Sequence, residues 1–190
     1  MKNILLFTTS LVNGGAEVFL VNLEKMLTDI GYNVTVVSTN KIELKECPEN
    51  YFSLALTRNK YLNVIIKPFK LRSFIKGNNI DLLIDNRAKL NVFKTLFYEI
   101  MFRNTRKIKI IHSYNLSSYF FNAKVLNYIF FGNYNKIVCV SYAIEKKVKL
   151  TTGLSNVTFI NNFVPKINID DTKNLACDLP FILFYGRLDN

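Results

Sequence analysis

The chain has 190 residues, of which 49% are hydrophobic, and it carries 16 Phe and 10 Tyr. This length and composition are enough to bury a sizeable core, which excludes global disorder. The net charge is +11, and the region from 50 to 165 holds 18 Lys/Arg against only four Asp/Glu. Such a field attracts polyanions, such as phosphorylated substrates, nucleic acid or an anionic membrane surface.

The cysteines and the single histidine restrict the metal chemistry and suggest a compartment. Cys47, Cys139 and Cys177 are far apart and form no C-x-x-C motif, and His112 is the only histidine. A zinc site of His and Cys ligands is therefore nearly excluded. Free thiols fit a reducing cytoplasm. The short apolar run at the N-terminus is typical of a buried strand rather than a signal peptide, and no apolar run reaches the length of a membrane-spanning helix.

Apolar runs of strand length alternate along the chain with segments of helical periodicity. We predict strands at 4–8, 34–38, 51–56, 81–84, 108–112, 137–141 and 157–160. Helices are predicted at 17–30, 64–76, 88–103, 118–131 and 143–150, with Gly31 ending the first and Pro68 starting or kinking the second. This alternation predicts an α/β, Rossmann-like fold, in which an open, mostly parallel sheet carries helices on both faces.

After the last of these strands, the sequence shows no clear periodicity of apolar residues until residue 181. We expect one domain over 1–164, a linker over 165–179, and the truncated start of a second domain over 180–190. The apolar run 181–185 is followed by Gly186-Arg187-Leu188. Because a lone strand cannot bury itself, this run is typical of a domain that has been cut, and an exposed strand would favour self-association.

Ligands of such sheets bind at the carboxyl ends of the strands, so residues that follow each strand are candidate site residues. Gly14, Gly15 and Glu17 lie between the first strand and the first helix. The glycines allow positive φ and close approach of a ligand, and the helix N-terminus suits a phosphate, although a plain tight turn remains an alternative. His112 ends the fifth strand, where it is either a ligand-binding group or a hydrogen-bonded cap. The motif is not G-x-G-x-x-G, so a nicotinamide cofactor is not indicated.

Asp85, Asn86 and Arg87 follow the fourth strand. Asp85 could accept a sugar hydroxyl and Arg87 could meet a phosphate, which would place the three residues on the acceptor side. The alternative is a helix-capping Asp or Asn beside a solvated Arg. Ser141 is predicted to cap the helix that follows it, rather than to act in catalysis.

The basic segments offer a further interpretation. Amphipathic helices rich in Lys and Arg suit anionic lipid headgroups, although solvated faces of core-packing helices are the alternative. The cations that we expect to face a membrane are Lys67, Lys70, Arg72, Lys76, Arg103, Arg106 and Lys107. No nucleic-acid-binding motif is visible, so no nucleic-acid partner is expected.

Taken together, these motifs resemble family-4 retaining glycosyltransferases of the GT-B architecture. The matching elements, in chain order, are Gly14-Gly15-Ala16-Glu17, the strand ending at His112, Val140-Ser141 before a Lys-rich helix, 159–164 as an "I-x-N-G-V" exit, and Tyr185-Gly186-Arg187-Leu188 as a "VGRL" element. The exit motif departs from the family pattern at Asn161-Asn162.

The resemblance implies two Rossmann-like domains that face each other across a cleft. A nucleotide-sugar donor would bind mainly to the second domain, and a glycan or lipid-linked acceptor to the first. Gly14 and Gly15 would approach the donor diphosphate and the acceptor, His112 would lie beside the transferred sugar, and Arg187 would contact the diphosphate. Neither a metal nor a cofactor is implied, in keeping with the absence of a D-x-D motif.

The expected function is therefore hexosyl transfer in bacterial surface polysaccharide or lipopolysaccharide biosynthesis, in the cytoplasm and peripheral to the inner face of the cytoplasmic membrane. The resemblance places the donor-binding lysine and paired glutamates beyond Asn190, so we expect no appreciable transferase activity from this chain alone. Two alternatives stay open. One is a non-catalytic remnant or partner-binding module, and the other is an unrelated nucleotide- or nucleic-acid-binding protein.

Overall fold

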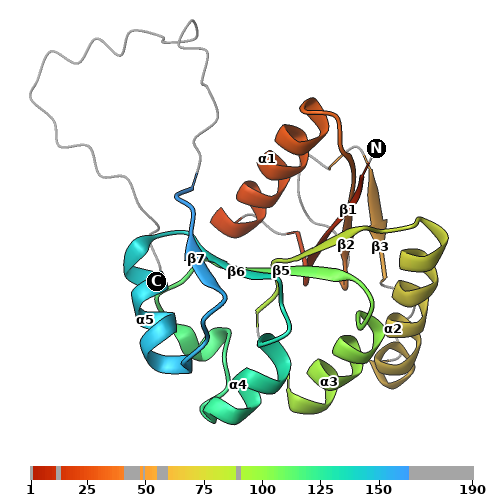
Figure 1. Ribbon diagram of the computed structural model, residues 1–190. Helices are drawn as coiled ribbons and strands as arrows, with labels where there is room; N and C mark the ends of the chain where they lie inside the picture. Colours follow the sequence, from red (N-terminus) through yellow and green to blue (C-terminus); the bar gives the residue numbers. More distant parts are fainter. Residues whose placement is uncertain are drawn as a thin grey trace, which may run out of the picture.

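A single parallel sheet organises the protein. The structure is a computed structural model that describes residues 2–11, 14–40, 48, 50–54, 60–88 and 91–162. Its seven strands are β1 (Asn3–Thr8), β2 (Asn33–Ser38), β3 (Tyr51–Ser53), β4 (Leu82–Asp85), β5 (Arg106–Ile111), β6 (Lys136–Cys139) and β7 (Val157–Phe159). They pair in the order β3-β2-β1-β4-β5-β6-β7, with every pair parallel. Figure 1 shows the twisted sheet with helices on both faces.

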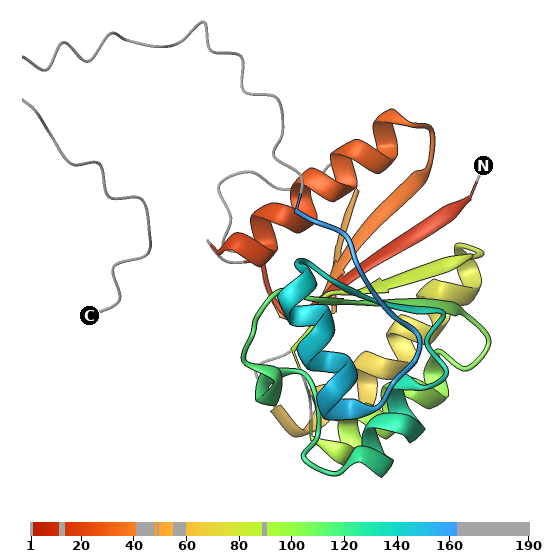
Figure 2. The same ribbon diagram turned by 60° about the vertical axis from the view of Figure 1, so that its left-hand side comes forward.

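The two faces of the sheet are covered unequally. The described helices are α1 (Gly15–Asp29), α2 (Lys60–Gly77), α3 (Val92–Met101), α4 (Lys124–Phe131) and α5 (Tyr142–Thr152), with a short 3-10 turn η1 (Leu116–Ser118). Helix α1 lies on one face, and α2 to α5 lie on the other (Figures 1 and 2). The predicted fold class, a Rossmann-like open parallel sheet between helices, is therefore confirmed.

Alternation along each strand distributes apolar side chains to both layers. In β1, Ile4 and Leu6 pack in the cluster around α1, whereas Leu5 and Phe7 pack in the cluster that α2 and α3 cover. A third cluster joins α4 and α5 to the other end of the sheet. Gly31 follows α1 with a φ of 92°, a left-handed conformation that favours glycine and explains why the helix ends there.

Two predicted helices have different boundaries in the structure. The predicted helix 88–103 begins only at Val92, where the Asn91 side chain accepts a hydrogen bond from the Lys94 backbone N–H. The predicted helix 118–131 is divided into η1 and α4. Between them, the Asn127 side chain accepts from the Phe121 backbone N–H and donates to its carbonyl, both at 2.7 Å. These bonds hold a non-helical turn that apolar periodicity does not reveal.

The predicted linker 165–179, the predicted second-domain start 180–190 and Arg187 lie outside the described residues. The prediction of self-association through 181–185 concerns the same segment. No helix within the described residues is both long enough and apolar enough to cross a membrane.

Candidate functional site

The sheet has its topological switch point between β1 and β4. Strand β1 pairs with β2 on one side and with β4 on the other, so the chain order reverses there. In open α/β sheets, ligands bind at the carboxyl ends of the strands at such a point. The predicted residues at the start of the first helix come after β1. Residues 85–87 lie at the end of β4, and His112 directly follows β5. The fold therefore brings these three predicted groups to one edge of the sheet.

Asn86 joins the three segments. Its Nδ2 donates to the Ala16 carbonyl oxygen at 3.3 Å, in the first turn of α1. Its Oδ1 lies 2.6 Å from His112 Nε2. The ring of Phe19 packs edge-on against the imidazole, with 5.0 Å between ring centroids. A side chain predicted as a cap or an acceptor ligand thus holds the start of α1 against the end of β5.

His112 is largely buried and neutral near neutral pH. Burial lowers the pKa of its imidazole to about 4, and the positive charge of Lys109 on the same strand adds to the effect. The His112 backbone N–H donates to the Tyr119 hydroxyl at 3.4 Å. Burial also raises the pKa of Tyr119, so the phenol keeps its proton. The side chains of Asn86 and Tyr119 therefore offer neutral hydrogen-bonding groups to His112. The charges that act on this group of side chains are those of Lys109 and Glu17.

The glycine loop, Gly14-Gly15-Ala16-Glu17, differs in one respect from the prediction. Gly14 caps α1 in an extended conformation, with φ of −153°, and positive φ in the described glycines occurs at Gly31 and Gly153 instead. The expected use of positive φ at Gly14 and Gly15 is therefore wrong.

The two glycines differ in what an added side chain would contact. A Cβ built on Gly14 would clash with Oε2 of Glu17, which folds back over the helix start, whereas a Cβ on Gly15 would meet nothing within 4 Å. The helix N-terminus is the positive end of the helix dipole, and Glu17 already places a carboxylate in its first turn. An external phosphate at this end would have to compete with that carboxylate.

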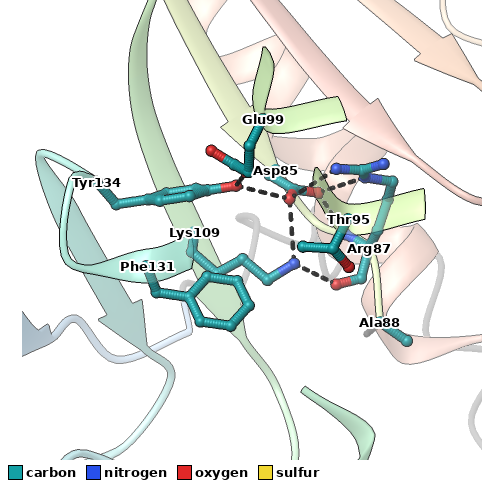
Figure 3. A pocket seen from close by; sticks show the side chains of 8 residues that line it. All are labelled: Asp85, Arg87, Ala88, Thr95, Glu99, Lys109, Phe131 and Tyr134. Carbon is teal, nitrogen blue, oxygen red and sulfur yellow. Dashed lines mark hydrogen bonds and ion pairs between the residues drawn. The ribbon is translucent and has the colours of Figure 1, made fainter. Parts of the chain in front are cut away.

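A buried cluster of charges surrounds Asp85 at the end of β4 and includes Arg87 and Lys109 (Figure 3). Arg87 donates to Asp85 through Nε at 2.8 Å and through Nη2 at 3.1 Å, and Lys109 Nζ lies 3.1 Å from Asp85 Oδ2. The Arg87 guanidinium carbon lies over the rings of Phe7, at 4.1 Å, and Tyr98, at 4.5 Å. Only 5% of Arg87 and 2% of Asp85 are exposed, so the alternative of a solvated Arg87 is wrong. A contact of either residue with an acceptor stays a prediction.

The cluster extends toward α3 and the turn after α4. The Tyr134 hydroxyl donates to Glu99 Oε1 at 2.8 Å and lies 3.3 Å from Asp85 Oδ2, and Lys107 forms an ion pair with Glu99. Burial alone would raise the pKa of Asp85, but the nearby cations hold it well below its usual range, whereas burial lowers the pKa of Lys109. A cavity of about 20 Å³, large enough for one water, adjoins the cluster. Its lining residues are Asp85, Arg87, Ala88, Thr95, Glu99, Lys109, Phe131 and Tyr134.

The predicted membrane-facing cations have different surroundings. Lys107 is only 5% exposed and pairs with Glu99 inside the protein, so it cannot face a membrane. Lys67 donates to the Thr39 carbonyl at 2.5 Å, and Lys70 lies 4.7 Å from the centre of the Phe52 ring. The remaining members of the set are exposed, and they are Arg72, Lys76, Arg103 and Arg106.

An exposed apolar patch lies on α3 and α4. We define this apolar patch as Phe93, Leu96 and Ile100 of α3 with Val125, Tyr128 and Ile129 of α4. Phe93 is 84% exposed and Tyr128 is 72% exposed. The sequence left both a membrane-facing and a core-packing interpretation open for the amphipathic helices, because periodicity shows that a stripe exists but not which side of the helix meets the sheet. Among the described residues, no group of three or more His, Cys, Asp or Glu side chains is placed to hold a metal ion.

Residues 13–166 match the sequence model of the family described as Glycosyltransferase Family 4. The fold is similar to that of the lipopolysaccharide outer core galactosyltransferase WaaB in its apo form, with a TM-score of 0.60 and 15% identity over 86% of this chain and 46% of that one. For HepE of Anabaena in complex with UDP, the TM-score is 0.61, the identity 18%, and the shares 85% and 44%. For MurG of Acinetobacter baumannii, the corresponding values are 0.55, 15%, 90% and 47%.

These identities show a shared fold, which corresponds to one half of the GT-B architecture. The chain matches less than half the length of each of these three structures. No curated protein sequence matches the chain.

Proposed function

Because the chain belongs to glycosyltransferase family 4, we propose that it provides the acceptor-side domain of a retaining enzyme, which transfers a hexosyl group from a nucleotide-sugar to a glycan or lipid-linked acceptor. The observation that carries this proposal is the joining of the glycine loop and His112 by Asn86 at the topological switch point. A ligand bound at this edge would meet the start of α1 and the imidazole together.

The similar structures support a nucleotide-sugar as donor and a bacterial surface glycan as product. WaaB is described as a lipopolysaccharide outer core galactosyltransferase, and HepE was solved with UDP. We therefore propose a role in lipopolysaccharide or surface polysaccharide biosynthesis in the cytoplasm. The identity of the hexose follows from neither description.

Within this function, the predicted residues have distinct roles. His112 lies beside the transferred sugar, and Gly14 and Gly15 approach the donor diphosphate and the acceptor. Arg187, which lies outside the described residues, contacts the diphosphate. The departing nucleoside diphosphate is stabilised by positive groups and helix N-termini rather than by a metal, which is an electrostatic contribution to catalysis.

Amide chemical shifts of the ¹⁵N-labelled chain test the site. We expect titration with a panel of UDP-hexoses to shift the amides of Gly14, Gly15 and His112, whereas the amide of Val18, one turn further along α1, serves as a local reference. Shifts confined to other regions, or no shifts at high ligand concentration, would contradict the proposed site. Because the chain spans less than half the length of the similar glycosyltransferase structures, we expect weak binding and no turnover by this chain alone.

A specific observation supports peripheral membrane association as part of this function. The apolar patch lies on the side of α3 and α4 that faces away from the sheet, and Lys94, Arg103 and Lys124 are exposed on or next to the same helices. Helices that lie in a membrane interface combine buried apolar side chains with cations at the headgroups. Each Lys or Arg near an anionic surface adds about 1 kcal/mol of attraction. We infer that this face contacts an anionic lipid surface.

Vesicle co-sedimentation tests that contact. Vesicles with anionic lipid should retain the chain more strongly than neutral vesicles, and Phe93→Ser with Tyr128→Ser should reduce retention. The matched control is Val18→Ser, since Val18 is 53% exposed but lies on α1, at the opposite face of the sheet. Equal loss of retention in the control, or retention that ignores lipid charge, would count against the proposal.

A further inference from the structure

Asn86 and His112 face each other with a geometry that determines which imidazole nitrogen carries the proton. We propose that Asn86 is a positioning residue that holds His112 in the Nε2–H tautomer and leaves Nδ1 as a hydrogen-bond acceptor for a hydroxyl of the bound sugar. The sugar hydroxyl rests on the function proposed above. The tautomer rests only on the contacts of these two side chains.

The first step concerns the orientation of the Asn86 amide. Its terminal group lies between the Ala16 carbonyl oxygen, at 3.3 Å, and His112 Nε2, at 2.6 Å. A carbonyl oxygen only accepts hydrogen bonds, so the amide must turn its NH₂ group toward Ala16. Its oxygen therefore faces His112. Since Asn86 is 8% exposed, water has little access to favour the reverse orientation.

The second step concerns the imidazole. The amide oxygen is also only an acceptor, so Nε2 of His112 must carry the hydrogen that lies between them. Burial disfavours an imidazolium, and the positive charge of Lys109 adds to that effect. Phe19 covers the ring from α1, and the Tyr119 hydroxyl is engaged with the backbone N–H of His112. A neutral imidazole has one N–H, so Nδ1 keeps its lone pair, and no described residue donates to it.

The third step is the chemical consequence. A nitrogen with a lone pair accepts a hydrogen bond from a hydroxyl, but it has no proton to donate to a phosphate oxygen. The ligand group that His112 recognises is therefore a neutral hydroxyl rather than the diphosphate. The same contacts fix the imidazole relative to the first turn of α1, because Asn86 bonds both partners. Asn86 therefore acts through His112 and not through a contact of its own with substrate.

The single histidine makes the tautomer directly measurable. In the 190-residue chain labelled with ¹⁵N-histidine, long-range ¹H–¹⁵N spectra at neutral pH should show one imidazole, with a protonated, pyrrole-type Nε2 and an unprotonated, pyridine-type Nδ1. Observation of the Nδ1–H tautomer, of an averaged mixture, or of an imidazolium at neutral pH would overturn the proposal.

Two variants separate positioning from a merely structural role. Asn86→Leu removes the acceptor, so the spectrum should shift to an averaged or Nδ1–H tautomer, whereas Asn122→Leu, at an exposed position, should leave it unchanged. Asn86→Asp keeps an acceptor facing Nε2, so it should keep the Nε2–H tautomer and move the imidazole titration to higher pH. An unchanged tautomer in Asn86→Leu would refute the role of Asn86. If that variant does not fold, the tautomer of the wild type and the titration of His112 in Asn86→Asp still test whether Asn86 positions the imidazole.

The proposed contact between Nδ1 and a sugar hydroxyl is tested separately, by the chemical shift of Nδ1. Addition of a UDP-hexose should shift the Nδ1 resonance, and UDP alone should shift it less, because UDP carries no hexose hydroxyl. A fixed Nε2–H tautomer with no difference between the two ligands would overturn the sugar hydroxyl while supporting the role of Asn86. The failure of the proposed function and the failure of the positioning role are thereby distinguishable.

Discussion

Asp85 is the carboxylate on which the buried charge cluster depends. It faces Arg87 and Lys109 at once, and all three side chains are at most 5% exposed. The variant Asp85→Asn keeps the shape of the side chain and removes its charge, which leaves two cations buried together. Removing one partner of a buried ion pair typically destabilises by about 3–5 kcal/mol. We expect a loss near 4 kcal/mol, a large share of the roughly 5–15 kcal/mol that holds a domain folded.

The pH dependence of this loss gives a second signature. Burial and Arg87 already lower the pKa of Lys109, and without Asp85 that pKa should fall further. Between the folded and the unfolded pKa of a lysine, the unfolded state binds more protons, so stability rises with pH. The deficit of Asp85→Asn relative to the wild type should therefore shrink as the pH is raised from neutral toward the ordinary lysine pKa of 10.5.

Urea denaturation followed by circular dichroism measures both effects, provided that the slope against urea concentration stays constant. The matched control is Glu145→Gln, because Glu145 pairs with Lys149, whose side chain is 48% exposed. A pair of that kind contributes under about 1 kcal/mol. The reasoning would be refuted if Asp85→Asn lost no more stability than the control, or if its deficit grew at high pH.

Three further predictions concern acid sensitivity, helix capping and packing. The folded pKa of His112, about 4, lies below its ordinary 6.5, so acidification through that window should cost up to about 3 kcal/mol in urea denaturation, and His112→Gln should abolish that part of the loss. Ser141 accepts from the Ile144 backbone N–H at 3.3 Å, so Ser141→Ala should cost about 1 kcal/mol, which the urea midpoint would report. Leu20 is fully buried on α1, so Leu20→Ala should lower stability by about 2–5 kcal/mol, and a loss below 1 kcal/mol would contradict its core position.

The fold was largely predictable because a buried parallel sheet has a direct signature in the sequence. Strands β1 and β2 are covered on both faces, so they appear as continuous apolar runs bounded by polar residues. The errors lie where one side chain, rather than a pattern, determines the backbone. Asn127 fixes the turn before α4 through two bonds to the backbone of Phe121, and no periodicity carries that information.

The positions of the site residues were predictable, but their partners were not. Ligands of parallel sheets bind at the carboxyl ends of the strands, and this alone predicted that His112 and residues 85–87 lie at the same edge. The pairing of Lys109 with Asp85 depends on which neighbouring strand lies alongside β4, which the sequence does not state. One signal was nevertheless present. Lys107 and Lys109 alternate with Ile108 and Ile110 at the start of the predicted strand 108–112, and lysines buried in a parallel sheet need carboxylates.

The same scarcity of acids that makes the chain basic also shapes the site. Only four Asp/Glu occur between 50 and 165, and two of them, Asp85 and Glu99, lie in the buried cluster with three cations. With Lys109 protonated, the cluster has an excess of one positive charge, and Lys109 lies three residues before His112 in the chain. Burial and then this charge disfavour an imidazolium, which preserves Nδ1 as an acceptor, and the charge also favours an anion at the switch point. The neutral imidazole for the proposed sugar hydroxyl and the positive field for the proposed diphosphate would therefore both be supported by one buried arrangement.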